Sequence, residues 1–308
     1  MRQQYISGRY FRSRYIKLHL LPETWDPSTT YFRSTSLERS LSSTLSFYSG
    51  LYSPDLFRFD ASQFHNIELP IETSFMLDED MIELWVPHGP AIYTMNGSSD
   101  SLLYSYKKIV CPSIKNFRKE NWMKDKAKDL AEQGLLGEEV RKHPYSHMAS
   151  RPDLVKLGTH NVFLQVIDYF KLALAKSKKE ARKIVKRIEY RDPAYKLFES
   201  WRSHNPDAGE LQLVVYGSHD TMIVSLINGM GMKLDKRVSV SSVISFELFL
   251  DDDNNPLVEV RFNRELLQLS TCKRAECSLD EFVKAVKKYG IFKSEEEYFE
   301  KCQYMTPN

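Results

Sequence analysis

The stretch LQLVVYGSHDTMIVSLINGMG, residues 211–231, decides the fold prediction. Its hydrophobic pattern changes from that of a strand to that of a helix at two reactive side chains, His219 and Asp220. Its first six residues are a mostly apolar, β-branched run that predicts a buried strand, and residues 221–230 predict an apolar helix. His219 and Asp220 therefore fall at a strand-to-helix turn. In an open α/β sheet such a turn lies at the carboxyl edge, where ligands bind and where a helix start offers free N–H groups to an anion. The alternative is a plain helix cap, in which Asp220 satisfies backbone donors and His219 has no role.

The composition is that of a globular protein. The 308 residues, of which 42% are hydrophobic, are enough for one large domain with an insertion or for two domains. The 43 Lys and Arg nearly balance the 41 Asp and Glu, so a net charge of +2 gives no reason to expect a nucleic-acid partner. No apolar run approaches the length of about 18 residues that a membrane-spanning helix needs. Residues 1–20 also lack the apolar core of a secretory signal.

The first part of the chain predicts two helices and a strand between them. Apolar and aromatic pairs four residues apart predict a helix from Met1, and TTYFR, residues 29–33, predicts a short strand. Thr35 and Glu38 fit a capping box at the start of the second helix. Arg39 falls in its first turn, where a cation is unfavourable against the helix dipole unless an anion binds nearby. The alternative is an ordinary solvated arginine.

The middle of the chain changes in character. Residues 54–110 contain two strand candidates and a glycosylation sequon that begins at Asn96, which matters only in an exported protein. Residues 111–204 are dense in charge and helical in pattern, so we expect a helical insertion there. Its basic run KSKKEARKIVKR, residues 176–187, has apolar residues interleaved as on an amphipathic helix. A solvated face is therefore favoured over a nucleic-acid site.

Two further strands and a helix complete the predicted fold. Residues 243–250 and 257–262 flank DDDNNP and predict two strands joined by a turn. A loop with two cysteines follows. Ser278 and Glu281 then predict the capped start of a helix.

Three segments together resemble the histidine acid phosphatase family, in particular its lysosomal and prostatic branch: YFRSTSLERSLSSTLSFYSGLYSP, the YGSHDT turn, and the last strand pair running into the cysteine loop. The resemblance implies an α/β three-layer sandwich with a mostly parallel central sheet and a helical cap. Residues 1–110 and 205–308 would form the core, and residues 111–204 the cap. It further implies a phosphomonoesterase that works at acidic pH through a phosphohistidine intermediate.

The family's site residues carry over only where its motifs are present. The arginine that ends the R-S-T-x-x-x-R element binds the substrate phosphate and corresponds to Arg39. The HD pair corresponds to His219, a phosphate ligand, and Asp220, the general acid. Arg33, the first arginine of the element, is either a structural residue or a further phosphate ligand. The implied ligand is a small phosphomonoester or inorganic phosphate, with no metal, no cofactor and no nucleic acid.

All four cysteines take part in the bridges that the resemblance implies, Cys272–Cys277 and Cys111–Cys302. Two disulfides would indicate a lysosomal or extracellular protein whose signal peptide lies outside these residues. A homodimer is compatible with this assignment. The alternative is four free buried thiols in a cytosolic protein.

One element of the family is absent from these residues, the R-H-G-x-R-x-P segment that supplies the nucleophilic histidine and two phosphate-binding arginines. Arg39 and His219 can hold a phosphate and Asp220 can protonate a leaving alkoxide, but nothing here attacks phosphorus. The strand that carries the segment would also be missing beside residues 211–216. We expect either an incomplete gene model of an acid phosphatase or a pseudo-phosphatase that binds a phosphate ligand or a protein partner. A third alternative, a structural protein without an anion site, requires Arg39 and His219 to lie far apart.

Overall fold

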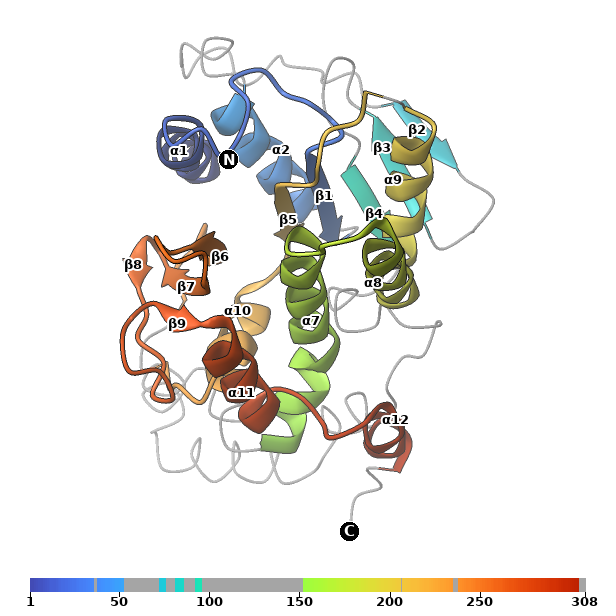
Figure 1. Cartoon of the computed structure of the whole chain (residues 1–308). Coiled ribbons are helices and arrows are strands. Elements are labelled where there is room, and N and C mark those ends of the chain that lie inside the picture. Colours follow the sequence, from blue (N-terminus) through green and yellow to red (C-terminus); the bar gives the residue numbers. More distant parts are fainter. Residues whose placement is uncertain are drawn as a thin grey trace, which may run out of the picture. The chain divides into compact units, whose positions relative to one another are not determined.

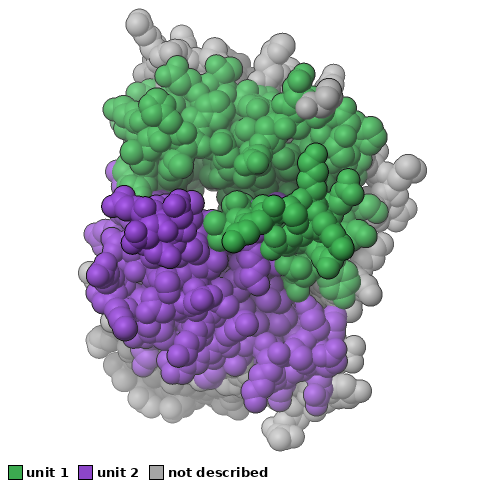
Figure 2. All heavy atoms as spheres, viewed as in Figure 1, with its two compact units in different colours: residues 1–106, 173–219 green, residues 107–172, 220–308 purple. Residues whose placement is uncertain are grey.

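The chain folds into two compact units, each discontinuous in sequence (Figure 1 and Figure 2). Unit 1 comprises residues 1–106 and 173–219, and unit 2 comprises residues 107–172 and 220–308. The predicted cap, residues 111–204, contributes to both units, and its boundaries stay a prediction. The computed structural model describes residues 1–35, 38–52, 72–75, 81–85, 92–95, 152–205, 207–234 and 238–304.

Unit 1 combines helices with a mixed sheet (Figure 1). The sheet has the order β2-β3-β4-β1-β5. β1 pairs parallel with both β4 and β5, whereas β3 pairs antiparallel with both β2 and β4. The described sheet is therefore mixed, and the mostly parallel three-layer arrangement stays a prediction. The elements of unit 1 are α1 (Arg2–Phe11), the π-helix η1 (Arg12–Ile16), β1 (Thr30–Thr35), α2 (Glu38–Tyr52), β2 (Glu72–Phe75), β3 (Met81–Trp85), β4 (Ile92–Met95), α8 (Lys178–Arg191), α9 (Pro193–Ser203) and β5 (Leu213–Gly217).

β1 forms the core of unit 1, and all six of its residues are buried. Because side chains alternate along a strand, neighbouring residues of β1 face opposite ways. Phe32 contacts Tyr48 of α2, with ring centroids 5.8 Å apart. Tyr31 instead contacts Tyr195 and Phe198 of α9, at 5.3 and 5.1 Å. The two helices thus cover opposite faces of this strand.

α1 and α2 touch through their backbones, and two glycines permit the approach. A Cβ atom on Gly8 would lie 2.0 Å from the carbonyl oxygen of Phe47, and one on Gly50 would lie 2.1 Å from that of Tyr5. Both distances are far inside van der Waals contact, so each helix needs glycine where the other passes. This contact anchors α2, whose first turn carries Arg39.

Unit 2 packs helices against a small antiparallel sheet (Figure 1). β6 pairs with β7, and β8 and β9 each pair with β7 as well. Phe246 of β6 contacts Phe163 of α7 and Phe282 of α11, with ring centroids 6.2 and 5.9 Å apart. The elements of unit 2 are α7 (Pro152–Ala173, without its last residue), α10 (Asp220–Gly229), β6 (Ile244–Leu250), β7 (Pro256–Phe262), β8 (Glu265–Leu266), β9 (Cys277–Ser278), α11 (Leu279–Tyr289) and α12 (Glu295–Tyr304).

Most of the local predictions within the described residues are confirmed. The apolar run before the HD pair forms β5, the apolar helix after it forms α10, and the predicted strand pair forms β6 and β7. Ser278 and Glu281 make the capping box of α11. Three strands, β2, β3 and β4, occur where the sequence indicates two. Thr35 ends β1, and residues 36 and 37, which separate it from α2, lie outside the described residues.

Cys272 and Cys277 form a disulfide in the loop before α11. Cys302, on α12, is buried. Its predicted partner Cys111 lies outside the described residues, as does the sequon at Asn96. Among the helices that the structure describes, none has the length and the apolar character needed to cross a membrane.

Candidate functional site

The candidate site lies where β1 and β5 end. The two strands run parallel, and Ser34 opposite Gly217 is the last matched pair. Parallel strands present their carboxyl ends at the same edge of a sheet, which is where ligands bind in open α/β folds. Thr35 is the last residue of β1, and His219 follows the end of β5 by two residues.

Gly217 is required at the end of β5 because the space beside it is already filled. A Cβ atom there would lie 2.1 Å from Thr44 Oγ1 of α2 and 2.8 Å from Ser34 Oγ. The Thr44 hydroxyl is itself held, since it donates to the carbonyl oxygen of Ser40 at 2.9 Å. α2 therefore packs directly on the end of β5, next to the turn that carries His219.

The side chain of His219 reaches the end of β1. Its Nε2 atom lies 3.2 Å from the hydroxyl oxygen of Thr35, a residue 184 positions away in the sequence. Thr35 is buried and His219 is partly exposed, so the contact joins the core of the sheet to its accessible edge. The parallel pairing of β1 with β5 brings the two residues together.

Arg39 and Asp220 each lie at the start of a helix. Arg39 is exposed in the first turn of α2, which begins three residues after the end of β1. Asp220 is exposed as the first residue of α10, and its carboxylate accepts a hydrogen bond from the backbone N–H of Thr221 at 2.9 Å. Both helix starts are suited to an anion. The convergence of Arg39, His219 and Asp220 on one pocket stays a prediction, because Asp220 belongs to the other unit.

Arg33 lies on the same face of β1 as Thr35 and is only 1% exposed. Its guanidinium forms an ion pair with Asp192, with 3.0 Å between Nη1 and Oδ1. Burial alone would lower the pKa of Arg33, but the charge of Asp192 raises that pKa above its ordinary value. This location favours the structural role for Arg33 over that of a phosphate ligand.

Asp192 is a central residue of this region and is not among the site residues predicted from the sequence. Its Oδ2 atom accepts hydrogen bonds from the hydroxyls of Tyr31 at 3.1 Å and Tyr216 at 3.4 Å. Its Oδ1 atom also accepts from the backbone N–H of Tyr195, which makes Asp192 the N-cap of α9. The buried carboxylate thus ties α9 to β1 and β5. An Asp followed by Pro193 at the first helical position is a recognisable helix-start signal, but it gives no information on the distant partners.

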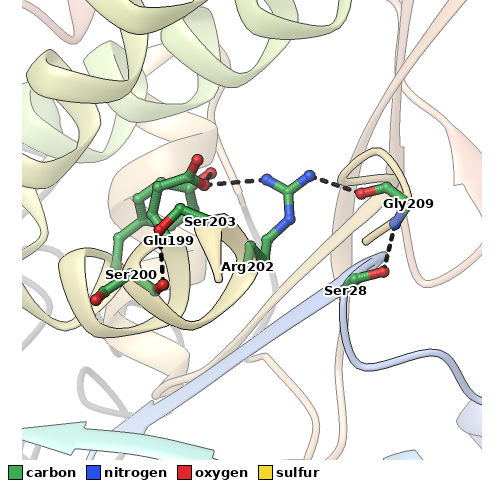
Figure 3. Close-up of polar contacts among 7 residues, drawn as sticks. Ser28, Glu199, Ser200, Arg202, Ser203 and Gly209 are labelled. Atoms are coloured by element: carbon green, nitrogen blue, oxygen red, sulfur yellow. Dashed lines mark hydrogen bonds and ion pairs between the residues drawn. The ribbon is translucent and has the colours of Figure 1, made fainter. Parts of the chain in front are cut away.

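A second set of polar contacts holds the segment that leads into β5 (Figure 3). Arg202 of α9 donates to the carbonyl oxygen of Gly209 at 2.6 Å and pairs with Glu199 at 3.0 Å. The backbone N–H of Gly209 in turn donates to Ser28 Oγ at 2.7 Å. Because Ser28 precedes β1 and Gly209 precedes β5, these bonds hold the two strands together at their amino ends.

β5 lies at one edge of the described sheet and, among the described strands, pairs with β1 alone. Its sequence LVVYG is largely apolar, yet each residue is only partly buried, in contrast with the fully buried β1. The edge of a sheet is a place where a further strand can pair. Among the described residues, no group of three or more His, Cys, Asp or Glu side chains is placed to hold a metal ion.

The first part of the chain is similar to a known protein family. Residues 1–143 match the sequence model of the histidine phosphatase superfamily, branch 2. The matched residues make up less than half of the chain. The match includes β1, α2 and Arg39, and hence the R-S-T-x-x-x-R element that carries the resemblance. The resemblance to histidine phosphatases is therefore confirmed.

The chain also shows distant similarity to known proteins over most of its length. It is 24% identical over 315 residues to a probable acid phosphatase of Dictyostelium discoideum, covering 90% of this chain and 63% of that protein. The chain thus spans less than two thirds of the length of this relative. Among solved structures, the phytase of Citrobacter braakii is 12% identical, with a TM-score of 0.45 over 98% of this chain and 88% of its own. The phytase of Klebsiella sp. ASR1 is 13% identical, with a TM-score of 0.45 over 94% of this chain and 84% of its own.

Proposed function

We propose that this chain is part of a phosphomonoester hydrolase that works through a phosphohistidine intermediate. The observation that carries the proposal is the contact of His219 with Thr35, which puts the predicted phosphate ligand at the ends of two parallel strands. Arg39 supplies a second charged donor, and Asp220 protonates the leaving alkoxide. The substrate is a small phosphomonoester. The match to a probable acid phosphatase supports activity at acidic pH.

The chemistry of the substrate explains the choice of groups. A phosphomonoester dianion needs several charge-assisted donors, each of which contributes about 1.5–3 kcal/mol. Arg39 in the first turn of α2 combines a guanidinium with the partial positive charge of the helix start. The departing oxygen gains negative charge as its bond to phosphorus breaks, so a carboxylic acid placed next to His219 in the chain is suited to protonate it.

The nucleophile, in this proposal, is a histidine on a strand with an R-H-G-x-R sequence that lies outside these residues. The apolar, partly exposed edge of β5 supports the idea, because a parallel strand paired there would end close to His219. The imidazole would form a bond to phosphorus while the alkoxide departs with the proton of Asp220. Water would then hydrolyse the phosphohistidine and release inorganic phosphate.

Export to the lysosome or the cell exterior belongs to the same proposal. The Cys272–Cys277 disulfide supports an oxidising compartment. The pairing of Cys111 with Cys302, glycosylation at Asn96 and assembly as a homodimer are further parts of it. Mass spectrometry of the unreduced, secreted protein would identify both bridges and any glycan directly.

Phosphate binding tests the site without requiring turnover. Calorimetric titration of the chain with inorganic phosphate should show one site. Arg39→Ala should weaken it about 10- to 150-fold, which is the loss of one charge-assisted hydrogen bond. The matched control is Arg182→Ala, which removes another exposed arginine near the start of a helix, α8. Equal affinities of the two variants would exclude Arg39 from the site.

Turnover tests the reaction. The chain as given should hydrolyse a chromogenic phosphomonoester no faster than its Asp220→Ala variant, because acid assistance is small beside a positioned nucleophile. If the natural sequence upstream encodes an R-H-G-x-R strand, joining it to the chain should give turnover at acidic pH. In that extended protein, Asp220→Ala should lower the rate about 10²- to 10⁴-fold. Asp220-dependent turnover by the chain alone would contradict the proposal, because another residue would then attack phosphorus.

The alternative is a pseudo-phosphatase that binds a phosphate ligand or a protein partner. It predicts phosphate binding that Arg39→Ala abolishes, together with no turnover and no R-H-G-x-R strand encoded upstream. The binding and turnover experiments therefore separate the two functions.

A further inference from the structure

Thr35 has a buried hydroxyl at the place where β1 meets His219. The residue is 0% exposed, and its Oγ1 atom lies 3.2 Å from Nε2 of the His219 ring. A hydroxyl that is buried without a hydrogen bond is unfavourable. The contact with the ring nitrogen therefore stabilises the folded protein, because it satisfies the buried hydroxyl.

Little freedom remains in the position of Thr35. Its backbone is in register with Met95 of β4, and the preceding residue, Ser34, is in register with Gly217 of β5. A β-branched side chain also restricts the rotation that would swing the hydroxyl away. The sheet therefore fixes the Thr35 hydroxyl, and the ring of His219 is oriented against a rigid partner.

The contact gives the two ring nitrogens of His219 different tasks. A neutral imidazole carries its proton on only one nitrogen. If the Thr35 hydroxyl donates to Nε2, the proton must be on Nδ1, and Nδ1–H is then a donor for an anion. In the cationic ring both nitrogens donate, and the Thr35 oxygen accepts instead. Threonine satisfies Nε2 in both states without the negative charge of a carboxylate, which would repel a phosphate.

We propose that Thr35 is a positioning residue for His219, which engages Nε2 and thereby presents Nδ1–H to the phosphate. This role rests on the proposed function, because the anion that Nδ1 meets is the phosphate of that site. It assigns a task to the threonine of the R-S-T-x-x-x-R element, in addition to that of the arginine at its end.

The test measures which nitrogen of His219 carries the proton. Nitrogen chemical shifts of the ¹⁵N-histidine-labelled chain report this at a pH where the ring is neutral, and His219→Gln assigns the signal. The expected result is Nδ1–H in the unaltered chain and in Thr35→Ser. Thr35→Val keeps the shape of the side chain but lacks the hydroxyl, and should shift the ring toward Nε2–H. Its affinity for inorganic phosphate should fall about 2- to 10-fold, and Thr35→Ser should retain the affinity of the unaltered chain.

Thr30→Val is the matched control. Thr30 is buried at the other end of β1, and its hydroxyl accepts a hydrogen bond from Trp25 Nε1 at 3.0 Å. This variant loses a buried hydroxyl from the same strand, yet the His219 tautomer and the phosphate affinity should not change. A shift as large as that of Thr35→Val would overturn the proposal by showing that the tautomer responds to any damage to β1.

Two further results would overturn it. Nε2–H in the unaltered chain would show that Thr35 accepts rather than donates, and this measurement remains decisive if Thr35→Val does not fold. The same tautomer in Thr35→Val and in the unaltered chain would show that the hydroxyl does not set it. Neither result depends on bound phosphate. An Nδ1–H tautomer in a chain that binds no phosphate would instead refute the proposed function, and with it the anion that Nδ1 serves.

Discussion

Asp192→Asn removes the negative charge that faces the buried guanidinium of Arg33. The two side chains are 0% and 1% exposed, and 3.0 Å separates the paired atoms. Breaking a buried ion pair by neutralising one partner costs about 3–5 kcal/mol, because the other charge is left without compensation. Arginine stays protonated in proteins, so Arg33 has no way to become neutral. Against a typical total stability of about 5–15 kcal/mol, this loss is large enough to measure and to threaten folding.

A double-mutant cycle in urea unfolding tests this reasoning, with Arg33→Met, Asp192→Asn and their combination. The combined variant buries no charge, and the asparagine oxygen can still accept hydrogen bonds from Tyr31 and Tyr216. We expect the combined loss to be smaller than the sum of the single losses by about 2 kcal/mol or more. If the two single losses in the free energy of unfolding simply add in the combined variant, the ion pair between Arg33 and Asp192 is not their cause. Phosphate affinity of the folded combined variant also decides the role of Arg33, since a structural arginine leaves it unchanged.

Three other changes test the packing, the electrostatics and the capping of the fold. Gly8→Ala and Gly50→Ala should each lower the free energy of unfolding by about 1–3 kcal/mol, because the new Cβ meets a carbonyl oxygen of the other helix. Ser43→Ala, also on α2, should leave the free energy of unfolding nearly unchanged. Equal melting temperatures for the three variants would contradict the close contact between α1 and α2. Burial raises the pKa of Tyr48 from 10.0 to about 12, so the stability that its neutral form contributes is complete below pH 10 and is lost as the pH rises toward 12. Tyr48→Phe should flatten this alkaline fall in urea unfolding, and an unchanged curve would assign the fall to other groups. Ser278→Ala should cost about 1 kcal/mol through loss of the capping box of α11, whereas Ser278→Thr should keep most of it. Equal losses for these two variants would mean that the hydroxyl is not the cause.

The elements next to the site are predictable because each has a short-range pattern. β5 and α10 follow from an apolar run whose period changes at Gly217. The start of α11 follows from Ser278 three residues ahead of Glu281. Such patterns depend only on neighbours in the sequence. They place His219 at the end of a strand and Arg39 in the first turn of a helix, and the structure agrees.

The contacts that connect these elements are not predictable in the same way. Asp192 has the pattern of a helix cap, but its charge faces an arginine of β1. Thr35 has the pattern of a helix cap as well, whereas its hydroxyl contacts His219. Glycine lowers the stability of a helix, so the sequence alone gives no reason for Gly8 within α1. The structure gives the reason, because α2 passes too close to Gly8 for a side chain. In each case the contacting residue is determined by how elements far apart in the chain pack together. Hydrophobic periodicity does not predict that packing.

β1 leaves the ribosome long before the residues that cover one of its two faces. Tyr31 precedes Asp192 by 161 residues, and Thr35 precedes His219 by 184 residues. At synthesis rates of about 5–20 residues per second, the delay lasts roughly 8–40 s. Throughout that time the face of β1 that carries Tyr31, Arg33 and Thr35 lacks these partners, although all six residues of the strand are buried in the folded protein. We therefore expect the yield of soluble protein to depend on how well this face is shielded until β5 has been made.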